Sequence, residues 1–166
     1  MSRLFSIVAV CLLSFGCGSP GTEFQRSGTP ALKLEVRRAS TETVEGWEAA
    51  TRSATQEPLF LSPQQELSND DVASTGVQQG DSGNWQIVVR LNDAAKKKFA
   101  ELSAELVDAE NVQTRGFTSK RLAVLVDGEV TFAPVVREPI THGVIYLSGE
   151  FTEQDACRIA KGIVGP

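Results

Sequence analysis

One stretch of sequence decides the fold: residues 120–151 read KRLAVLVDGEVTFAPVVREPITHGVIYLSGEF. Within it, an apolar run at residues 122–126 meets Asp127-Gly128, and a second apolar run follows at residues 130–132. Asp-Gly between two β-prone runs predicts a hairpin, because glycine accepts the positive φ that a tight primed turn requires. The sequence therefore predicts two antiparallel strands joined at this dipeptide.

The rest of the stretch carries more turn chemistry and little reactive chemistry. Pro134 follows the hairpin, and a third apolar run at residues 144–147 lies between Gly143 and Gly149. Proline lacks the N–H that a central strand uses, and glycine commonly bounds short strands. The pattern indicates an architectural role for this stretch.

Strand and helix signals surround it. Residues 32–37 and 85–91 alternate between apolar and polar side chains, which predicts half-buried strands. Residues 92–106 and 152–163 each begin with a capping residue and repeat apolar residues on one helical face. We therefore expect an α+β fold, with a mostly antiparallel sheet and two main helices packed on one face.

The N-terminal residues have the pattern of a secretory signal. Residues 1–16 contain Arg3 and then an apolar run that is too short to span a bilayer. The run ends in Gly16-Cys17, and a small residue before cysteine resembles the bacterial lipobox, although Ser14 stands where that pattern usually has leucine. The resemblance implies that Cys17 is lipid-modified; the alternative is an ordinary cleaved signal peptide.

The chain divides into three predicted parts. Residues 1–16 form the signal peptide, residues 17–31 form a lipid-anchored flexible tether, and residues 32–166 form a single domain. We expect a membrane-anchored lipoprotein of the bacterial cell envelope that faces the periplasm or the exterior. The net charge is −5 at pH 7 and there is no basic stripe, which argues against a nucleic-acid partner.

Few residues carry reactive chemistry. The sequence has no phosphate-binding loop, no nucleophile elbow and no paired zinc-binding histidines. His142 is the only histidine, and Cys157 is the only cysteine left once Cys11 and Cys17 are assigned to the signal and the lipid. Cys157 is therefore predicted to be a buried thiol without a disulfide partner. We expect no metal, no cofactor, no small-molecule substrate and no enzymatic activity.

Acidic residues offer the remaining alternative. Glu150, Glu153 and Asp155 lie close together in the sequence, but the EF-hand spacing is absent, and acids near a helix N-terminus complement the helix dipole. Asp127 has a sufficient structural role in the hairpin turn. An enzyme that uses Asp127 and His142, or this acidic cluster, is the minor hypothesis.

Several motifs, taken in order, resemble the head subdomain of SecD, a membrane subunit of the bacterial protein-export machinery. The motifs are KRLAVLVDGEV at residues 120–130, Ala133-Pro134, Pro139-Ile140, Gly143 and LSGEFTEQDA at residues 147–156. The similarity extends over about residues 59–163. Residues 107–119 are longer than the family's connection, and Ser119 stands where the family usually has glycine. We expect neither the base subdomain nor the transmembrane helices of SecD here, so its proton-driven transport is not carried over.

The resemblance implies a head-like fold and six structural positions of the family motif: Asp127, Gly128, Pro134, Gly143, Gly149 and Phe151. In the family, the head is thought to contact unfolded substrate protein. We therefore expect a non-catalytic envelope module that binds an unidentified protein or an extended peptide, which would pair with an exposed strand edge. A structural accessory subunit of a membrane complex is the alternative.

Overall fold

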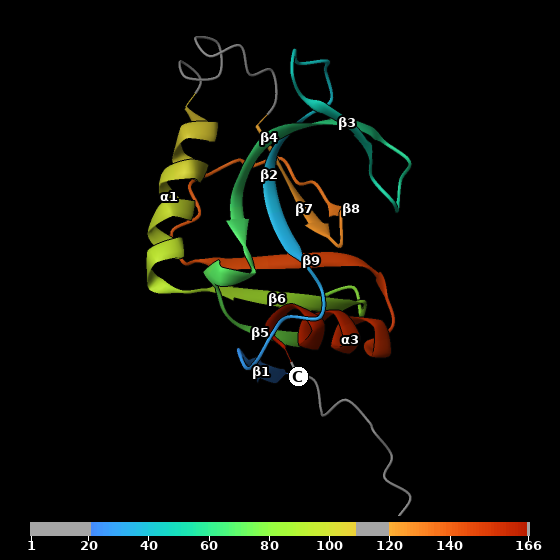
Figure 1. Cartoon of the computed structure of the whole chain (residues 1–166). Helices are drawn as coiled ribbons and strands as arrows, with labels where there is room; N and C mark the ends of the chain where they lie inside the picture. Colours follow the sequence, from blue (N-terminus) through green and yellow to red (C-terminus); the bar gives the residue numbers. More distant parts are fainter. Residues whose placement is uncertain (1–20, 109–119, 166) are drawn as a thin grey trace, which may run out of the picture.

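The computed structural model describes residues 21–108 and 120–165 (Figure 1). Within these residues one sheet has four strands in the order β1-β5-β6-β9, namely β1 (Thr22–Gln25), β5 (Val72–Gln79), β6 (Trp85–Leu91) and β9 (Val144–Phe151). The other sheet has five strands in the order β3-β4-β2-β7-β8, namely β3 (Glu48–Thr51), β4 (Pro58–Ser68), β2 (Leu34–Ser40), β7 (Arg121–Val126) and β8 (Glu129–Phe132). The helices are α1 (Asp93–Val107) and α3 (Glu153–Val164), and a short 3-10 turn, η1 (Asn69–Asp71), connects β4 to β5.

The α+β class, the antiparallel pairing and the two helices confirm the prediction from sequence. The strands, however, form two sheets where one was predicted. The difference arises because alternation identifies a strand but not its partners: β2 pairs with β4 and β7, and β6 pairs with β5 and β9. In Figure 1 the five-stranded sheet stands across the strands of the four-stranded sheet and curves above them.

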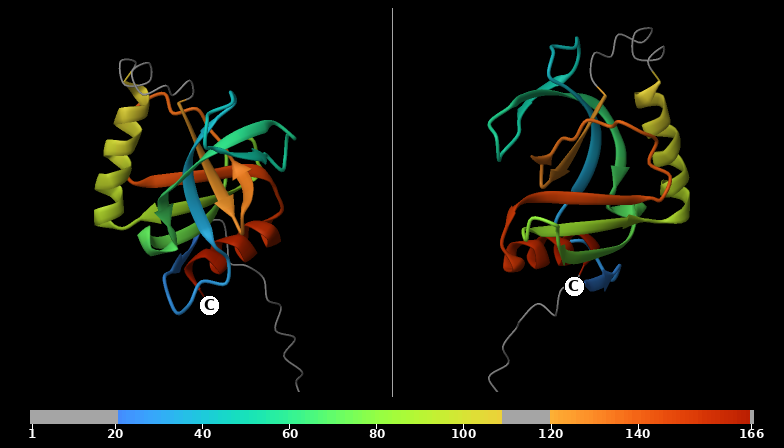
Figure 2. Two further views of the ribbon diagram at one scale, coloured as in Figure 1. Left: turned by 45° about the horizontal axis from the view of Figure 1, so that its top comes forward. Right: turned by 180° about the vertical axis from the view of Figure 1, so that it is seen from behind.

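Both helices pack on the same face of the four-stranded sheet, as predicted. Ile87 and Val89 of β6 point to this face and join one buried cluster with side chains of α1, such as Phe99, and of α3, such as Ile163. Val36 of β2 lies in the same cluster, so the two sheets share one core. Figure 2 shows α1 standing at one end of the sheets and α3 lying along the four-stranded sheet.

The predicted hairpin is formed by β7 and β8. Asp127 has a φ of 50° and Gly128 has a φ of 83°, as a type I′ turn requires at its two central positions. The strands pair antiparallel, with one bulge between their two ends. The local sequence was sufficient to predict this element because the turn conformation excludes most other residue types.

The prediction of a flexible tether over residues 17–31 is wrong for the described residues 21–31. β1 pairs with β5 along its whole length, and Phe24 packs against the main core. This short polar segment is held because a ladder of backbone hydrogen bonds and one aromatic side chain attach it to the domain. Residues 1–20, with the predicted signal peptide and Cys17, lie outside the described residues.

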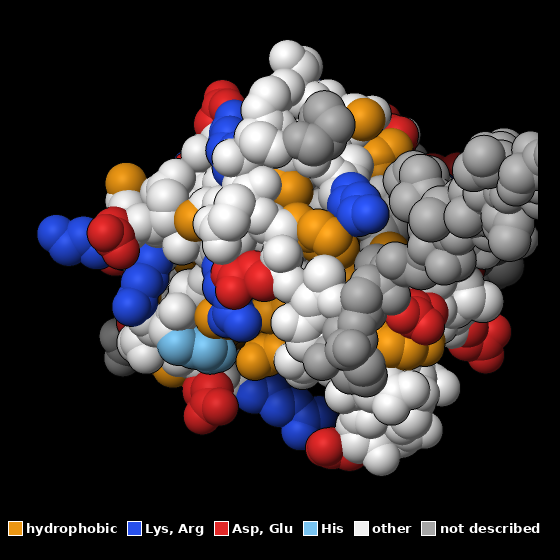
Figure 3. All heavy atoms as spheres, turned by 90° about the horizontal axis from the view of Figure 1, so that it is seen from below, with side chains coloured by type: hydrophobic (Ala, Val, Ile, Leu, Met, Phe, Trp, Pro, Cys, Tyr) orange, Lys and Arg blue, Asp and Glu red, His pale blue; other side chains and the backbone are white. Residues whose placement is uncertain are grey.

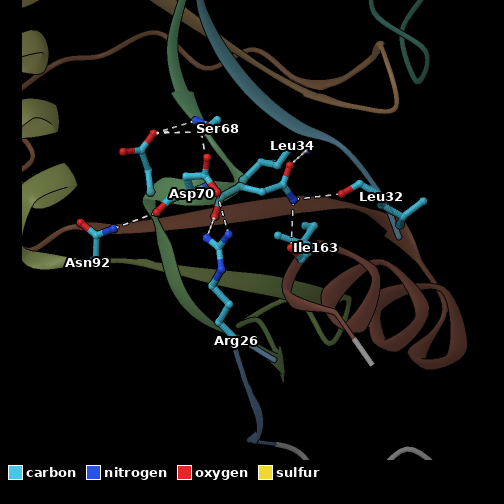
Figure 4. Close-up of polar contacts among 9 residues, drawn as sticks. Arg26, Leu32, Leu34, Ser68, Asp70, Asn92 and Ile163 are labelled. Atoms are coloured by element: carbon cyan, nitrogen blue, oxygen red, sulfur yellow. Dashed lines mark hydrogen bonds and ion pairs between the residues drawn. The ribbon is translucent and has the colours of Figure 1, made fainter. Parts of the chain in front are cut away.

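The corner between β4 and β5 is held by the side-chain amide of Asn69. Its Oδ1 accepts a hydrogen bond from Leu34 N–H, and its Nδ2 donates to the carbonyl oxygens of Leu32 and Ile163, each at 2.9 Å. Figure 4 shows Leu32, Leu34 and Ile163 converging on this corner. One side chain thereby joins η1 to the start of β2 and to the end of α3.

The same corner holds α1. Asn92 Oδ1 accepts a hydrogen bond from the first turn of the helix and so caps it, while Asn92 Nδ2 donates to Asp70 O at 3.0 Å. Farther along the helix, Arg38 of β2 binds Glu66 of β4 at 2.9 Å and Glu105 of α1 at 3.0 Å. Polar contacts therefore attach both ends of α1 to the sheets.

Replacement of Asn69 with alanine is expected to lower the free energy of unfolding by about 3 kcal/mol, because three hydrogen bonds of about 1 kcal/mol each are lost. Urea unfolding followed by far-UV circular dichroism measures the change. The matched control is Asn84→Ala, at an exposed asparagine between β5 and β6, which should cost less than about 0.5 kcal/mol. Equal losses in the two variants would show that the Asn69 amide does not hold the corner.

Candidate functional site

An apolar hollow of about 320 Å³ lies between β9, the end of β8 and α1, and we call it the β9 groove. Its lining is almost entirely hydrophobic and comes from both sheets, from α1 and from the segment between β8 and β9: Val36, Phe99, Leu122, Val124, Phe132, Pro134, Val136, Ile140, His142, Val144, Ile145, Tyr146 and Ser148. A concave apolar surface with few polar groups is typical of a binding site.

β9 presents an unpaired strand edge to this groove. Among the described strands, β9 pairs only with β6. Leu91 N–H donates to Gly143 O at 2.9 Å, and this fixes which residues of β9 bond to β6. Because antiparallel pairs alternate, the N–H and C=O groups of Val144, Tyr146 and Ser148 point away from β6. These three residues therefore offer backbone donors and acceptors on the groove side.

Of the two exposed large hydrophobic side chains of the described chain, one lines the groove and the other lies next to lining residues in the sequence. They are Val135, which is 45% exposed, and Tyr146, which is 44% exposed. Tyr146 lines the groove, and Val135 lies between the lining residues Pro134 and Val136. Hydrophobic area left in solvent beside an apolar hollow marks a surface that can be covered by a partner.

A second hollow of about 560 Å³ lies at the C-terminal end of β9, and we call it the acidic pocket. It is formed by the β7–β8 turn, the end of β9, α3 and the segment after β3: Leu32, Ser53, Ala54, Val126, Asp127, Glu129, Thr131, Gly149, Glu150, Phe151, Arg158 and Ile159. Three carboxylates and one guanidinium line it, so its net charge is negative. On the face seen from below, acidic and basic side chains are interspersed (Figure 3).

Asp127 acts in the turn through its side chain. Its Oδ1 accepts a hydrogen bond from Lys33 N–H at 2.7 Å, and its own N–H donates to Lys33 O at 2.8 Å. These bonds join the β7–β8 turn to the residue before β2. Asp127 lines the acidic pocket, whereas His142 lines the β9 groove. The two residues of the enzyme hypothesis thus lie in different hollows.

The other motif positions surround the two hollows. Pro134 lines the β9 groove, and Gly149 and Phe151 line the acidic pocket. Gly143 precedes β9 with a φ of 66°, and a Cβ there would lie 2.8 Å from the Lys96 side chain. Glycine is therefore required where the chain enters β9.

Cys157 is 6% exposed in α3 and is disulfide-bonded. Its predicted burial is confirmed, and the prediction that it has no disulfide partner is wrong. The prediction failed because Cys11 was assigned to the signal peptide and Cys17 to the lipid, which left Cys157 no partner. Both of those cysteines lie outside the described residues.

The three acidic residues Glu150, Glu153 and Asp155 do not lie together in one site. Glu150 lines the acidic pocket, while Glu153 and Asp155 lie in the first turn of α3. The Thr152 hydroxyl donates to Asp155 Oδ2 at 2.6 Å and, together with the backbone N–H of Thr152, lowers the pKa of the Asp155 carboxyl. Asp155 therefore forms a capping box with Thr152 at the start of α3.

Within residues 21–108 and 120–165, no group of three or more His, Cys, Asp or Glu side chains is placed to hold a metal ion. None of the helices in that part of the chain is long and apolar enough to cross a membrane.

Sequence reasoning did not identify the groove. It assigned Phe99 to the core face of a helix and residues 144–147 to a strand, but it found no role for Phe132 or Tyr146. The sequence feature that could have indicated the groove is Tyr146, a large aromatic residue in a predicted strand. Alternation along the strand places it on the face opposite to its buried neighbour Leu147.

Residues 41–164 match the family model described as SecDF, P1 head subdomain. Protein translocase subunit SecD of Sebaldella termitidis is 33% identical over 95 residues, which are 57% of this chain and 21% of that protein. Protein translocase subunit SecDF of Thermus thermophilus is 31% identical over 94 residues, which are 57% of this chain and 11% of that protein. The chain spans about a fifth of the length of the SecD relatives that it matches.

Two solved structures have the same fold. One is described as the crystal structure of SecDF in the super-membrane-facing form; it gives a TM-score of 0.61 at 22% identity and covers 81% of this chain and 19% of that one. The other is described as a membrane component, SecDF, that enhances protein export; it gives a TM-score of 0.60 at 23% identity and covers 84% of this chain and 62% of that one.

Two substitutions of Asp127 distinguish the contribution of its hydrogen bond to stability from the contribution of its charge. Asp127→Ala should lower the free energy of unfolding by about 1–2 kcal/mol, because Lys33 N–H loses its acceptor. Asp127→Asn should cost less than about 0.5 kcal/mol, since its amide oxygen still accepts this bond and asparagine tolerates positive φ. Urea unfolding measures both. If Asp127→Asn lowers the free energy of unfolding as much as Asp127→Ala does, the negative charge of Asp127 stabilises the fold more than its hydrogen bond in the turn does.

Proposed function

Because this chain belongs to the family of the SecDF P1 head subdomain, we propose that it is a non-catalytic domain that binds extended, apolar segments of protein chains in the β9 groove. The observation that carries this proposal is the unpaired edge of β9 beside an apolar hollow. Relatives of the chain are named protein translocase subunits. We extend their connection with protein export to this chain.

Backbone pairing supplies the first part of the recognition. An extended chain that lies along β9 forms hydrogen bonds with the outward N–H and C=O groups of Val144, Tyr146 and Ser148. Each such bond contributes about 1 kcal/mol and does not depend on the side chains of the bound segment. Strand addition therefore suits a partner whose sequence varies.

The groove supplies the second part. Side chains of an added strand alternate between two faces: on the core face they meet Phe99 and Phe132, and on the opposite face they meet Tyr146. Burial of one Leu, Ile or Phe side chain contributes about 1.5–3 kcal/mol. The groove therefore selects for apolar character in the bound segment, and it selects little for sequence.

The test uses one proline substitution at the free edge of β9. The Tyr146 N–H points away from β6, so Tyr146→Pro removes a donor to the bound peptide without removing a bond to β6. Tyr146→Ala removes the aromatic ring but keeps the N–H, and it is the matched control. The probe is a fluorescent short peptide that alternates Val or Leu with Ser or Thr, and fluorescence anisotropy measures its Kd.

Both variants should bind more weakly than the wild type, and Tyr146→Pro should bind about fivefold more weakly than Tyr146→Ala because one more hydrogen bond is lost. Circular dichroism and urea unfolding establish that the two variants are equally folded. Equal affinity of the two would rule out strand addition at β9. Wild-type protein that does not bind the peptide at all would overturn the proposed function.

We place this activity at the membrane surface of the bacterial cell envelope, with Cys17 lipid-modified and the domain held through it. Support comes from the signal-like residues 1–16, from the lipobox resemblance at Cys17 and from membership of a family whose relatives are translocase subunits. In a lipoprotein that has lost residues 1–16 and carries lipid on Cys17, Cys157 has no cysteine of this chain to pair with, whereas the structure has Cys157 disulfide-bonded. The bonding state of the cysteines therefore decides between the lipid anchor and a disulfide at Cys17.

Cys17→Ser is expected to move the protein from the membrane fraction to the soluble fraction of the expressing cells, since the lipid is lost. Cys157→Ser, which leaves Cys17 intact, is the control and should remain with the membrane. Mass spectrometry of the non-reduced, digested protein identifies the state of each cysteine. A peptide in which Cys17 is disulfide-linked would overturn the lipid anchor.

A further inference from the structure

We propose that the β9 groove and the acidic pocket form one binding seam, which prefers apolar segments that carry a Lys or Arg about four residues from the side chain held beside Tyr146. This inference rests on the proposed function, because it takes the binding of an extended chain at β9 as given. It adds a substrate class: apolar segments flanked by a basic residue.

The two hollows are continuous along the strands that border them. On β9, Ser148 lines the groove and the next residue, Gly149, lines the pocket. On β8, Phe132 lines the groove and its neighbour Thr131 lines the pocket. Successive residues on both borders pass from one hollow to the other, so a chain extended along β9 continues from the groove into the pocket.

Charge distinguishes the two ends of this seam. Asp127, Glu129 and Glu150 line the pocket, and the only base among its lining residues is Arg158, which lies 3.9 Å from Asp155 of its own helix. Glu129 and Glu150 are exposed and form no ion pair with other described residues. The groove end has no carboxylate in its lining. The pocket end therefore attracts a cationic side chain, and the groove end does not.

The apolar part of the pocket suits the shape of Lys and Arg. Leu32, Val126 and Ile159 lie in the same lining as the three carboxylates. Long basic side chains bury their methylene stems on apolar surface and place the charged group among acceptors. A side chain with both features fits this pocket better than a small cation or a fully apolar residue.

The spacing follows from strand geometry. Tyr146 lies in the groove lining and Glu150 in the pocket lining, four residues farther along β9. At about 3.3 Å per residue this separation is about 13 Å. An extended partner covers the same distance with about four residues, which sets the position of its basic residue.

The experiment compares four peptides on the full-length protein by fluorescence anisotropy. All share the alternating apolar core described above. One carries Lys about four residues to the N-terminal side of the core centre, one carries Lys at the same distance on the C-terminal side, one carries Gln at both positions and one carries Glu at both positions.

One of the two Lys peptides should bind about fivefold more tightly than the Gln peptide, and the Glu peptide should bind more weakly than the Gln peptide. Which Lys peptide binds more tightly reports the direction of the bound chain, since the pocket lies at one end of β9. The preference should shrink when NaCl is raised from about 0.05 M to about 0.5 M, because salt screens exposed charges.

The double variant Glu129→Gln/Glu150→Gln should bind all four peptides about equally. The matched control, Glu42→Gln/Glu45→Gln, removes the same charge from exposed residues between β2 and β3 and should keep the preference. If wild-type protein binds the Lys, Gln and Glu peptides equally, the proposed preference of the seam for a basic residue is wrong, and the proposed function stands. If it binds none of them, both are wrong.

Discussion

The side-chain amide of Asn69 is the contact on which the arrangement of the two sheets depends. Its oxygen and both of its N–H groups are used, by the start of β2 and by the end of α3. A half-buried amide that loses a partner costs about 1–3 kcal/mol, so this corner has one favourable geometry. Asn92 attaches α1 to the neighbouring Asp70. This corner therefore attaches both helices at the crossing of the two sheets, whose apolar side chains share one core.

The β9 groove is a consequence of that crossing. β9 ends one sheet with a free edge, whereas the outer edge of β8 is bridged to Arg52 and Ser53, and side chains of both sheets line the hollow beside β9. Proteins usually cover or interrupt an unpaired edge, because it invites association with other chains. Here the edge borders apolar side chains and carries an exposed tyrosine, which favours occupation by an extended partner. The fold is that of the SecDF P1 head, and the function proposed above places an extended chain in this groove.

Elements that depend on neighbouring residues were predictable. The Asp127-Gly128 turn, the cap at Asn92 and the cap at Thr152 each satisfy local backbone groups, and local rules identify them. Residues 21–31 were not predictable in the same way, because a short polar strand is stable only where another strand offers a free edge. The disulfide at Cys157 was missed for a related reason, since pairing joins residues that are distant in sequence.

The sequence by itself determined the α+β class, the two helices with their apolar faces, and the hairpin, because these follow from periodicity and turn chemistry within a few residues. It also carried the resemblance to the SecD head. Only the tertiary structure decided that the strands form two sheets, that β9 keeps a free edge and that Tyr146 lies beside an apolar hollow. The physical reason is that a strand pattern states which face is buried, whereas pairing and the hollow between sheets depend on contacts between segments far apart in the chain.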